Sequence, residues 1–207
     1  MDSVFLDFLK KKLTESLPGI DSHLKMTPYR RLTKTIPEDR REGAVLLLLY
    51  QKNGELYFPL IQRHEYKGVH SNQISFPGGK VEIGDESLLQ TAIRETEEEI
   101  GVSKSLIKTL GALSELYIPP SNFMVSPFVG YITSEPNFVK EEREVKEILE
   151  VSLSNFLNNS SIKQTEVLVA NGMKLKTPYF ELNDKVVWGA TAAILQEFKE
   201  VCQRNFD

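Results

Sequence analysis

The sequence predicts an α/β fold. Short apolar stretches separated by turn signals run along the 207-residue chain, a pattern typical of strands. Two stretches with helical spacing interrupt this pattern, a central one at about residues 86–100 and a terminal one at Thr191–Gln203. Apolar residues make up 41% of the chain, which is enough to form a sizeable core. Strands and helices that share one core are expected to pack in layers.

The N-terminal region is expected to contain one amphipathic helix, from Ser3 to Ser16. Apolar residues recur there at helical spacing, and Pro18-Gly19 follows as a stop signal. Residues 20–42 are polar, and we interpret them as a connection over the surface. We therefore divide the chain into an N-terminal helix with its connecting segment, residues 1–42, and one domain over residues 43–207.

A strand hairpin and a helix are expected to follow. The continuous apolar run from Ala44 to Tyr50 is typical of a buried strand. Asn53-Gly54 is a strong hairpin turn signal, so Leu56–Gln62 is expected to return as the partner strand. Residues 64–75 are predicted to form a polar loop, which leads to the helix at about residues 86–100.

The second half of the chain is expected to hold further strands and two helices. The predicted strands are Leu106–Leu116, Phe128–Thr133 and Met173–Phe180, and a loop with Pro119, Pro120 and Pro127 separates the first two. Glu141–Leu149 is highly charged and is interpreted as either a strand edge or a short helix. A short helix is predicted over Leu153–Asn158, capped by Ser152 or Ser154, before the terminal helix.

The composition excludes several classes of protein. A net charge of −4 gives no electrostatic case for nucleic acid, and the single cysteine, Cys202, excludes an intrachain disulfide framework. No signal peptide is visible, and no stretch approaches the roughly 18 apolar residues of a membrane span. We expect a cytoplasmic protein with neither a nucleic-acid nor a membrane partner. The sequence does not determine the oligomeric state, and a homodimer is one of the alternatives.

The segment Gly78–Val102 is the most informative, GGKVEIGDESLLQTAIRETEEEIGV. Glu95, Glu98 and Glu99 stand at i, i+3 and i+4, so they share one helical face. Carboxylate oxygens grouped in this way suit Mg²⁺ or Mn²⁺. A helix that holds cations beside a glycine-rich turn indicates phosphate chemistry, whereas the alternative is a solvated acidic face without a ligand.

This segment resembles the signature of the Nudix hydrolases, G-x5-E-x7-R-E-U-x-E-E-x-G-U, in which U is aliphatic. It has Gly79, five residues, Asp85, eight residues, and then Arg94-Glu95-Thr96-Glu97-Glu98-Glu99-Ile100-Gly101-Val102. The first carboxylate is either Asp85, with one extra residue after it, or Glu86, with the extra residue before it. Thr96 replaces an aliphatic residue. The resemblance implies a Nudix α/β/α sandwich with a mixed central sheet and hydrolysis of a nucleoside diphosphate linked to another group.

Flanking segments resemble the coenzyme A pyrophosphatase branch of this family. Leu60-Ile61-Gln62-Arg63 and His70-Ser71-Asn72-Gln73-Ile74-Ser75-Phe76-Pro77-Gly78-Gly79 are similar to L-L-T-x-R and G-x3-F-P-G-G, with Asn72 replacing a glycine. Val187-Trp188-Gly189-Ala190-Thr191-Ala192 is similar to the W-G-x-T-A segment that opens the last helix. This resemblance implies hydrolysis of coenzyme A or acyl-coenzyme A to 3′,5′-ADP and 4′-phosphopantetheine or its acyl derivative. The alternatives are another nucleoside diphosphate derivative, such as ADP-ribose or a dinucleoside polyphosphate, and a non-catalytic Nudix-like regulator that binds a nucleotide.

The resemblance also implies roles for the signature residues. Glu95, Glu98 and Glu99 are the implied ligands of Mg²⁺ or Mn²⁺, together with the backbone carbonyl of Gly78. Arg94 is expected to orient a glutamate by a charge-assisted hydrogen bond, and its alternative role is direct contact with phosphate. Glu95, Arg94 and Glu98 are therefore the expected catalytic residues.

Other residues are expected to complete the site. Arg63 and Lys67 are candidates for binding substrate phosphate, and Gly79 lets the main chain approach the metal and the phosphate closely. Tyr117 and Phe123 are interpreted as packing residues, with stacking on a base as the alternative. The general base stays open between a signature glutamate and a separate carboxylate. The candidates outside the signature are Glu141, Glu142, Glu144 and Glu147.

Overall fold

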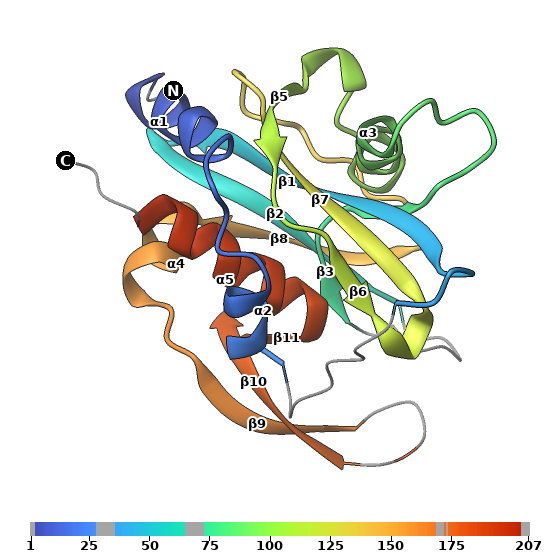
Figure 1. Cartoon of the computed structure of the whole chain (residues 1–207). Coiled ribbons are helices and arrows are strands. Elements are labelled where there is room, and N and C mark those ends of the chain that lie inside the picture. The colour runs from blue at the N-terminus through green and yellow to red at the C-terminus, as the bar shows by residue number, and fades with distance from the viewer. Residues whose placement is uncertain (1–2, 28–35, 65–72, 169–171, 173, 204–207) are drawn as a thin grey trace.

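The fold is built around one mixed sheet (Figure 1). The computed structural model describes residues 3–27, 36–64, 73–168, 172 and 174–203. Strand β1 (Arg41–Lys52) pairs in parallel with β7 (Phe123–Tyr131) and antiparallel with β2 (Glu55–Arg63). This parallel pairing makes the sheet mixed, because the other strand pairs described in it are antiparallel.

The remaining strands of this sheet flank the three central ones. They are β3 (Ile74–Ser75) and β8 (Val145–Ser152) on β2, β4 (Gly78–Lys80) on β1, and β5 (Lys108–Ala112) and β6 (Leu116–Ile118) on β7. β4 is in register with the first half of β1, where Val45 lies opposite Gly78. The predicted glycine-rich turn at Gly78 and Gly79 is therefore part of a strand, held against the most central strand of the sheet.

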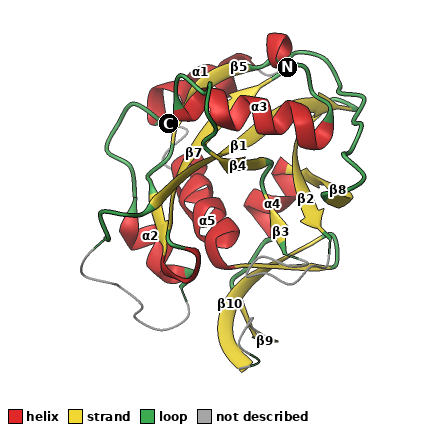
Figure 2. Cartoon of the chain, turned by 90° about the vertical axis from the view of Figure 1, so that its right-hand side faces the viewer, coloured by secondary structure: helices red, strands yellow, loops and turns green. Residues whose placement is uncertain are grey.

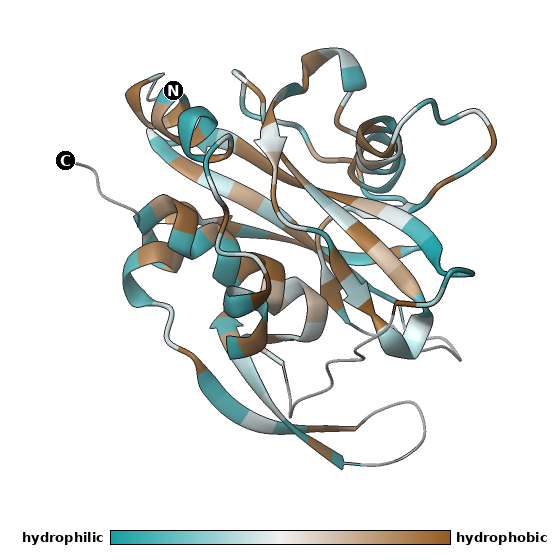
Figure 3. Ribbon diagram, viewed as in Figure 1, coloured by the Kyte–Doolittle hydropathy of each residue, from teal (hydrophilic) through white to brown (hydrophobic). Residues whose placement is uncertain are grey.

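Helices cover both faces of the sheet (Figure 1, Figure 2). They are α3 (Leu88–Ile100) on one face, and α1 (Ser3–Lys12), α4 (Leu153–Asn159) and α5 (Gly189–Gln203) on the other. Alternate residues of β1 point to opposite faces. Leu46 and Leu48 share a core cluster with Ala92 of α3, whereas Leu47 belongs to the cluster that contains Phe198 of α5. Figure 3 shows apolar residues both in the strands of the sheet and in the helices that pack on it. The expected α/β/α sandwich with a mixed central sheet is confirmed.

The N-terminal region differs from the expectation. Helix α1 ends at Lys12, four residues before the predicted end. The predicted surface connection over residues 20–42 is wrong in its first part, because helix α2 (Ile20–Lys25) forms there. His23 and Met26 are buried in this part of the chain. A helix of this length is too short to be stable alone, so tertiary packing and not local periodicity stabilises it.

The predicted hairpin is confirmed. Asn53 and Gly54 have φ values of 51° and 84°, the left-handed conformation that a tight two-residue turn requires. Residues 65–72 of the predicted loop lie outside the described residues, and Ile74–Ser75 at its end forms β3. Short 3₁₀ helices at Lys104–Leu106 and Pro119–Ser121 connect the next elements.

Pro127 lies inside strand β7 and not in the predicted loop. It pairs with Val45 of β1 on one side of β7. On the other side of β7, the pairing with β5 ends at Phe128 and the pairing with β6 begins at Val125. Pro127 therefore lies in the gap between the two paired stretches. A proline, which has no N–H to donate to a ladder, is tolerated at such a break.

The C-terminal part forms a second sheet of three strands in the order β11–β10–β9. The strands are β9 (Lys163–Leu168), β10 (Lys174–Leu182) and β11 (Lys185–Trp188), of which only β10 was predicted. The hairpin of β9 and β10 extends away from the body of the molecule (Figure 1, Figure 2). The charged segment Glu141–Leu149 becomes a strand only from Val145, and Ser152 caps α4 as expected. Among the described helices, none is long and apolar enough to cross a membrane.

Candidate functional site

Helix α3 carries the acidic residues, and local sequence fixes both of its ends. The side chain of Ser87 accepts a hydrogen bond from the Gln90 N–H at 3.3 Å and caps the N-terminus. Gly101 ends the helix with φ 73°, and a Cβ there would lie 2.9 Å from Val139. Thr96, which replaces an aliphatic residue of the signature, is buried, and its hydroxyl donates to the Ala92 carbonyl at 2.7 Å. The buried hydroxyl is thereby satisfied within the helix.

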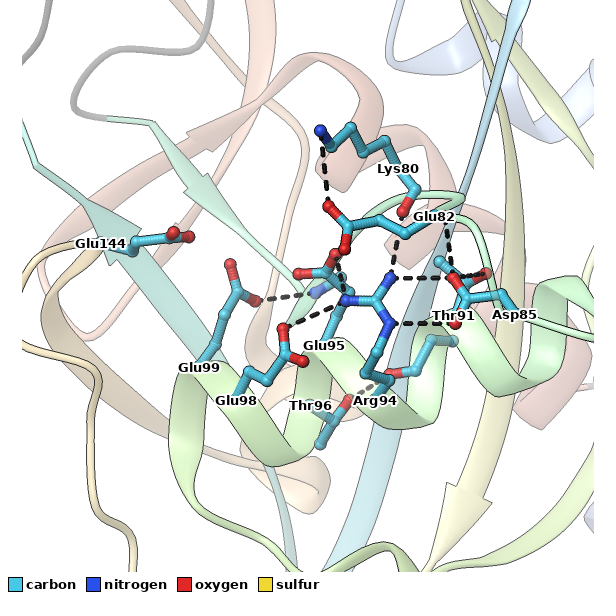
Figure 4. A network of polar contacts seen from close by, with 12 residues as sticks. Lys80, Glu82, Asp85, Thr91, Arg94, Glu95, Thr96, Glu98, Glu99 and Glu144 are labelled. Atoms are coloured by element: carbon cyan, nitrogen blue, oxygen red, sulfur yellow. Dashed lines mark hydrogen bonds and ion pairs between the residues drawn. The ribbon is translucent and has the colours of Figure 1, made fainter.

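Asp85, and not Glu86, is the carboxylate that pairs with Arg94 (Figure 4). Arg94 Nε and Nη2 donate to the two Asp85 oxygens at 3.0 Å and 2.9 Å. Asp85 also accepts hydrogen bonds from the Glu82 N–H and the Thr91 hydroxyl. Arg94, first among these partners, holds the pKa of Asp85 well below its usual range. Sequence reasoning missed Thr91, which no signature position marks.

Arg94 also orders the two other acidic residues nearest to it. Its Nη1 donates to Glu95 Oε1 at 3.0 Å and to Glu98 Oε2 at 3.1 Å. Its Nη2 reaches the Lys80 carbonyl of β4 at 3.2 Å. Arg94 therefore fixes the helix carboxylates and the adjoining strand relative to one another.

Glu95 lies against the glycine turn. A Cβ added at Gly79 would lie 2.4 Å from Glu95 Oε1, closer than two unbonded atoms can approach. Only glycine at this position lets the carboxylate reach the main chain of β4. Burial raises the pKa of Glu95, although the charge of Arg94 opposes this effect.

Glu99 is the most deeply buried of the three glutamates, with 2% of its side chain exposed. It accepts hydrogen bonds from Arg63 Nη2 at 2.7 Å and from the Gly78 N–H at 2.8 Å. Burial raises the pKa of Glu99 to about 7, and the charge of Arg63 and the Gly78 N–H partly offset this rise. Glu98 differs, because 58% of its side chain is exposed.

The oxygen donors are of the chemical type that hard divalent cations prefer, but they do not converge on one point. Among the described residues, no group of three His, Cys, Asp or Glu side chains is arranged to hold a metal ion. The carboxylates of Glu95 and Glu99 are turned toward Arg94 and Arg63. One guanidinium nitrogen of Arg63 contacts both Glu99 and the Gly78 carbonyl, at 2.7 Å and 2.9 Å. Two of the proposed oxygen donors, Glu99 Oε1 and the Gly78 carbonyl, therefore already contact one positive charge.

Four carboxylates outside the signature are candidates for the general base, and Glu144 is the one that lies nearest to the Arg63 guanidinium. The segment before Glu144 docks on the end of α3, where the Val139 and Glu141 N–H groups donate to Ile100 and Glu99 carbonyls. Glu144 Oε2 is 4.0 Å from Arg63 Nη1, and Figure 4 shows it facing Glu99. Its charge contributes to the raised pKa of both Glu95 and Glu99. The other three bond elsewhere, Glu141 to the Arg143 N–H, Glu142 to Lys140 and Glu147 to Lys185.

Of the remaining predicted residues, the structure describes Tyr117 and Phe123. Lys67 and His70 lie outside the described residues. Tyr117 donates a hydrogen bond to Asn122 at 2.8 Å, and the guanidinium of Arg41 stacks 4.3 Å from the centre of the Phe123 ring. Both aromatic side chains therefore have partners within the protein.

The comparisons with known proteins agree with this architecture. Residues 40–166 match the model of the NUDIX domain. A protein described as the uncharacterized Nudix hydrolase NudL of Yersinia pestis (strain Pestoides F) is 30% identical over 184 residues, which are 89% of this chain and 88% of that protein. Its namesake from Photorhabdus laumondii subsp. laumondii is 29% identical over 82% of this chain and 89% of its own length.

Two solved structures share the fold. The Nudix hydrolase RenU of M. smegmatis has a TM-score of 0.54 and 18% identity, with 78% of this chain and 85% of that chain covered. The MutT protein of Methanosarcina mazei Go1 has a TM-score of 0.50 and 21% identity, with 80% and 96% covered. The domain match covers more than half of the chain and includes the acidic helix with its glycine turn. The chain therefore belongs to the Nudix family of pyrophosphohydrolases.

Proposed function

We propose that this protein hydrolyses the pyrophosphate bond of coenzyme A or acyl-coenzyme A, giving 3′,5′-ADP and 4′-phosphopantetheine or its acyl derivative. The supporting observation is a contact between the two segments that resemble the coenzyme A branch. Thr191 Oγ1, in the first turn of α5, donates to the Ile74 carbonyl at 2.9 Å across 117 residues of sequence. Ile74 lies in β3, which leads directly to Gly78 and Gly79. Both segments thus meet at β3, which precedes Gly78 and Gly79 in the chain.

Because carboxylates line the site, an anionic substrate can bind there only if the negative charge of the substrate is neutralised. Glu95, Glu98, Glu99 and the Gly78 carbonyl are proposed to hold Mg²⁺ or Mn²⁺. When bound, such an ion neutralises phosphate oxygens and lowers the pKa of a bound water. Arg94 keeps Glu95 and Glu98 in place through its hydrogen bonds, and Asp85 in turn fixes Arg94. The burial of Glu95 and Glu99 keeps bulk water from competing for their oxygens.

Glu144 is the proposed general base. Its side chain is 58% exposed, so water has access to its carboxylate, and it faces the site across Arg63. Replacing Glu144 with Gln removes the proton acceptor without changing side-chain size. We expect kcat to fall by roughly 100-fold, the usual range for one general base, with little change in KM. Glu142→Gln is the matched control, because Glu142 pairs with Lys140 on the same segment. Equal kcat values in the two variants would exclude Glu144.

A substrate panel tests the proposal. Purified protein with Mg²⁺ or Mn²⁺ is incubated with coenzyme A, dephospho-coenzyme A, acyl-coenzyme A, ADP-ribose and a dinucleoside polyphosphate, and products are identified by mass spectrometry. Coenzyme A or its acyl form should have the highest kcat/KM. A Glu95→Gln protein purified in the same way should be inactive, which excludes a contaminating enzyme. If the protein binds metal yet releases no 3′,5′-ADP at high enzyme concentration, the proposed substrate is wrong.

The comparison of coenzyme A with dephospho-coenzyme A isolates the 3′-phosphate. Arg63 and Lys67 are the proposed contacts for this group. Arg63→Ala and Lys67→Ala should therefore reduce kcat/KM for coenzyme A more than for the dephosphorylated compound. A uniform loss for both compounds would show that neither residue contacts the 3′-phosphate.

A further inference from the structure

Arg63 is bonded to the atoms that would hold the metal. Its Nη2 donates to Glu99 Oε1 at 2.7 Å and to the Gly78 carbonyl at 2.9 Å. A single nitrogen therefore lies within bonding distance of two of the four proposed ligands. Because a guanidinium is always charged, this nitrogen brings a permanent positive charge to the same oxygens.

The surroundings of Arg63 let its side chain be both held and released. Glu99 is almost completely buried, and a buried carboxylate without a partner is strongly destabilising. Arg63 itself is 23% exposed, and its other terminal nitrogen, Nη1, lies 4.0 Å from the exposed carboxylate of Glu144. The β2–β8 register also shifts between Gln62 and Arg63, the kind of irregularity that re-aims a side chain at the end of a strand.

From this geometry we propose that the guanidinium of Arg63 and the divalent ion compete for the same donors, Glu99 and the Gly78 carbonyl. Arg63 keeps the buried carboxylate paired and the glycine turn in place, and the ion binds by displacing the guanidinium from these two donors. Arg63 is thus a positioning residue that sets the affinity of the site for metal. The inference rests on the metal ligands assigned in the proposed function, but not on the identity of the substrate.

The test is metal binding without any substrate. Affinity for Mn²⁺ is measured by calorimetry at about pH 8 for the wild-type protein and for Arg63→Met, whose side chain is long, unbranched and uncharged. Removing the competing cation should tighten Mn²⁺ binding by at least about tenfold, since the ion no longer has to break two charge-assisted hydrogen bonds. Arg63→Lys, which keeps the charge but has no forked guanidinium, should have an intermediate affinity.

Lys52→Met is the matched control for the loss of one positive charge. Lys52 pairs with Glu150 and lies seven residues along β1 from Val45, the residue opposite Gly78. That separation is about 23 Å along a strand, more than twice the screening length of roughly 10 Å at 0.1 M salt. Its affinity for Mn²⁺ should equal that of the wild type.

Unfolding in urea with and without Mn²⁺ supplies a second measurement. Without Mn²⁺, Arg63→Met should be less stable than wild type, and saturating Mn²⁺ should stabilise it more than it stabilises wild type.

Equal or weaker Mn²⁺ binding by folded Arg63→Met or Arg63→Lys would overturn the competition and make Arg63 a purely structural support. If neither the wild type nor the variants bind Mn²⁺, the metal ligands of the proposed function are wrong as well. Normal Mn²⁺ binding with no hydrolysis of coenzyme A would refute the proposed substrate alone.

Discussion

Glu99 should make the stability of the protein depend on pH. Burial raises its pKa to about 7, whereas an exposed glutamate has a value of 4.5. A group whose pKa is higher in the folded state binds a proton more tightly there, so its contribution to stability is fully present below pH 4.5. That contribution is lost as pH rises through 7. Between about pH 8 and about pH 5.5, proton binding by Glu99 should add about 2 kcal/mol to the free energy of unfolding.

Glu99→Gln isolates this contribution. Glutamine is neutral and close in size to the protonated carboxyl, so the variant should lack the pH-dependent part that Glu99 provides. Urea unfolding is followed through the fluorescence of Trp188, the only tryptophan, in the presence of a chelator that removes divalent ions. On lowering the pH, the wild-type protein should gain about 2 kcal/mol more stability than Glu99→Gln. Subtracting the two proteins removes the contribution of every other titrating group that the substitution leaves unchanged.

Glu97→Gln is the control, because it makes the same charge change on the same helix. Glu97 accepts a hydrogen bond from the Lys104 N–H and does not contact Arg63 or Gly78 in the described structure. The stability of the Glu97→Gln protein should change with pH as that of the wild-type protein does. The reasoning is refuted if Glu99→Gln and wild type gain the same stability at the lower pH, or if the wild type gains less.

Three further predictions test the site and the core. Asp85→Asn should lower kcat/KM by roughly 10–100-fold, because Asp85 orients Arg94, which in turn holds two of the proposed metal ligands. Glu86→Gln should leave kcat/KM nearly unchanged in the same steady-state assay. Gly79→Ala should reduce kcat by about 100-fold, because the added Cβ displaces the Glu95 carboxylate, while circular dichroism still shows a folded protein. Glu197→Ala should cost about 3 kcal/mol in urea unfolding, since Glu197 is fully buried and accepts hydrogen bonds from His23 and two backbone N–H groups. A full-activity Asp85→Asn, an unimpaired Gly79→Ala or a Glu197→Ala as stable as wild type would each contradict its argument.

Sequence patterns predicted the elements whose stability is local. The hairpin at Asn53-Gly54 and helix α3 were predicted because turn chemistry and helical periodicity are properties of neighbouring residues. Helix α2 and strands β9 and β11 are among the elements that were missed. Helix α2 is stabilised by packing against α5, and strands β9 and β11 are stabilised by pairing with β10. Because these contacts are tertiary, the sequence of each element has no strong local pattern.

The sequence by itself predicted which residues of the acidic helix belong to the candidate site. The spacing of Glu95, Glu98 and Glu99 places them on one side of a helix whatever the rest of the chain does, because helical periodicity is local. Only the tertiary structure decided the partners and the burial of these groups. In that structure Asp85, and not Glu86, pairs with Arg94. Glu144 lies near Arg63, and Arg63 pairs with Glu99. The physical reason is that these contacts depend on how strands and loops far apart in sequence approach one another, and on how much water each carboxylate loses when they do.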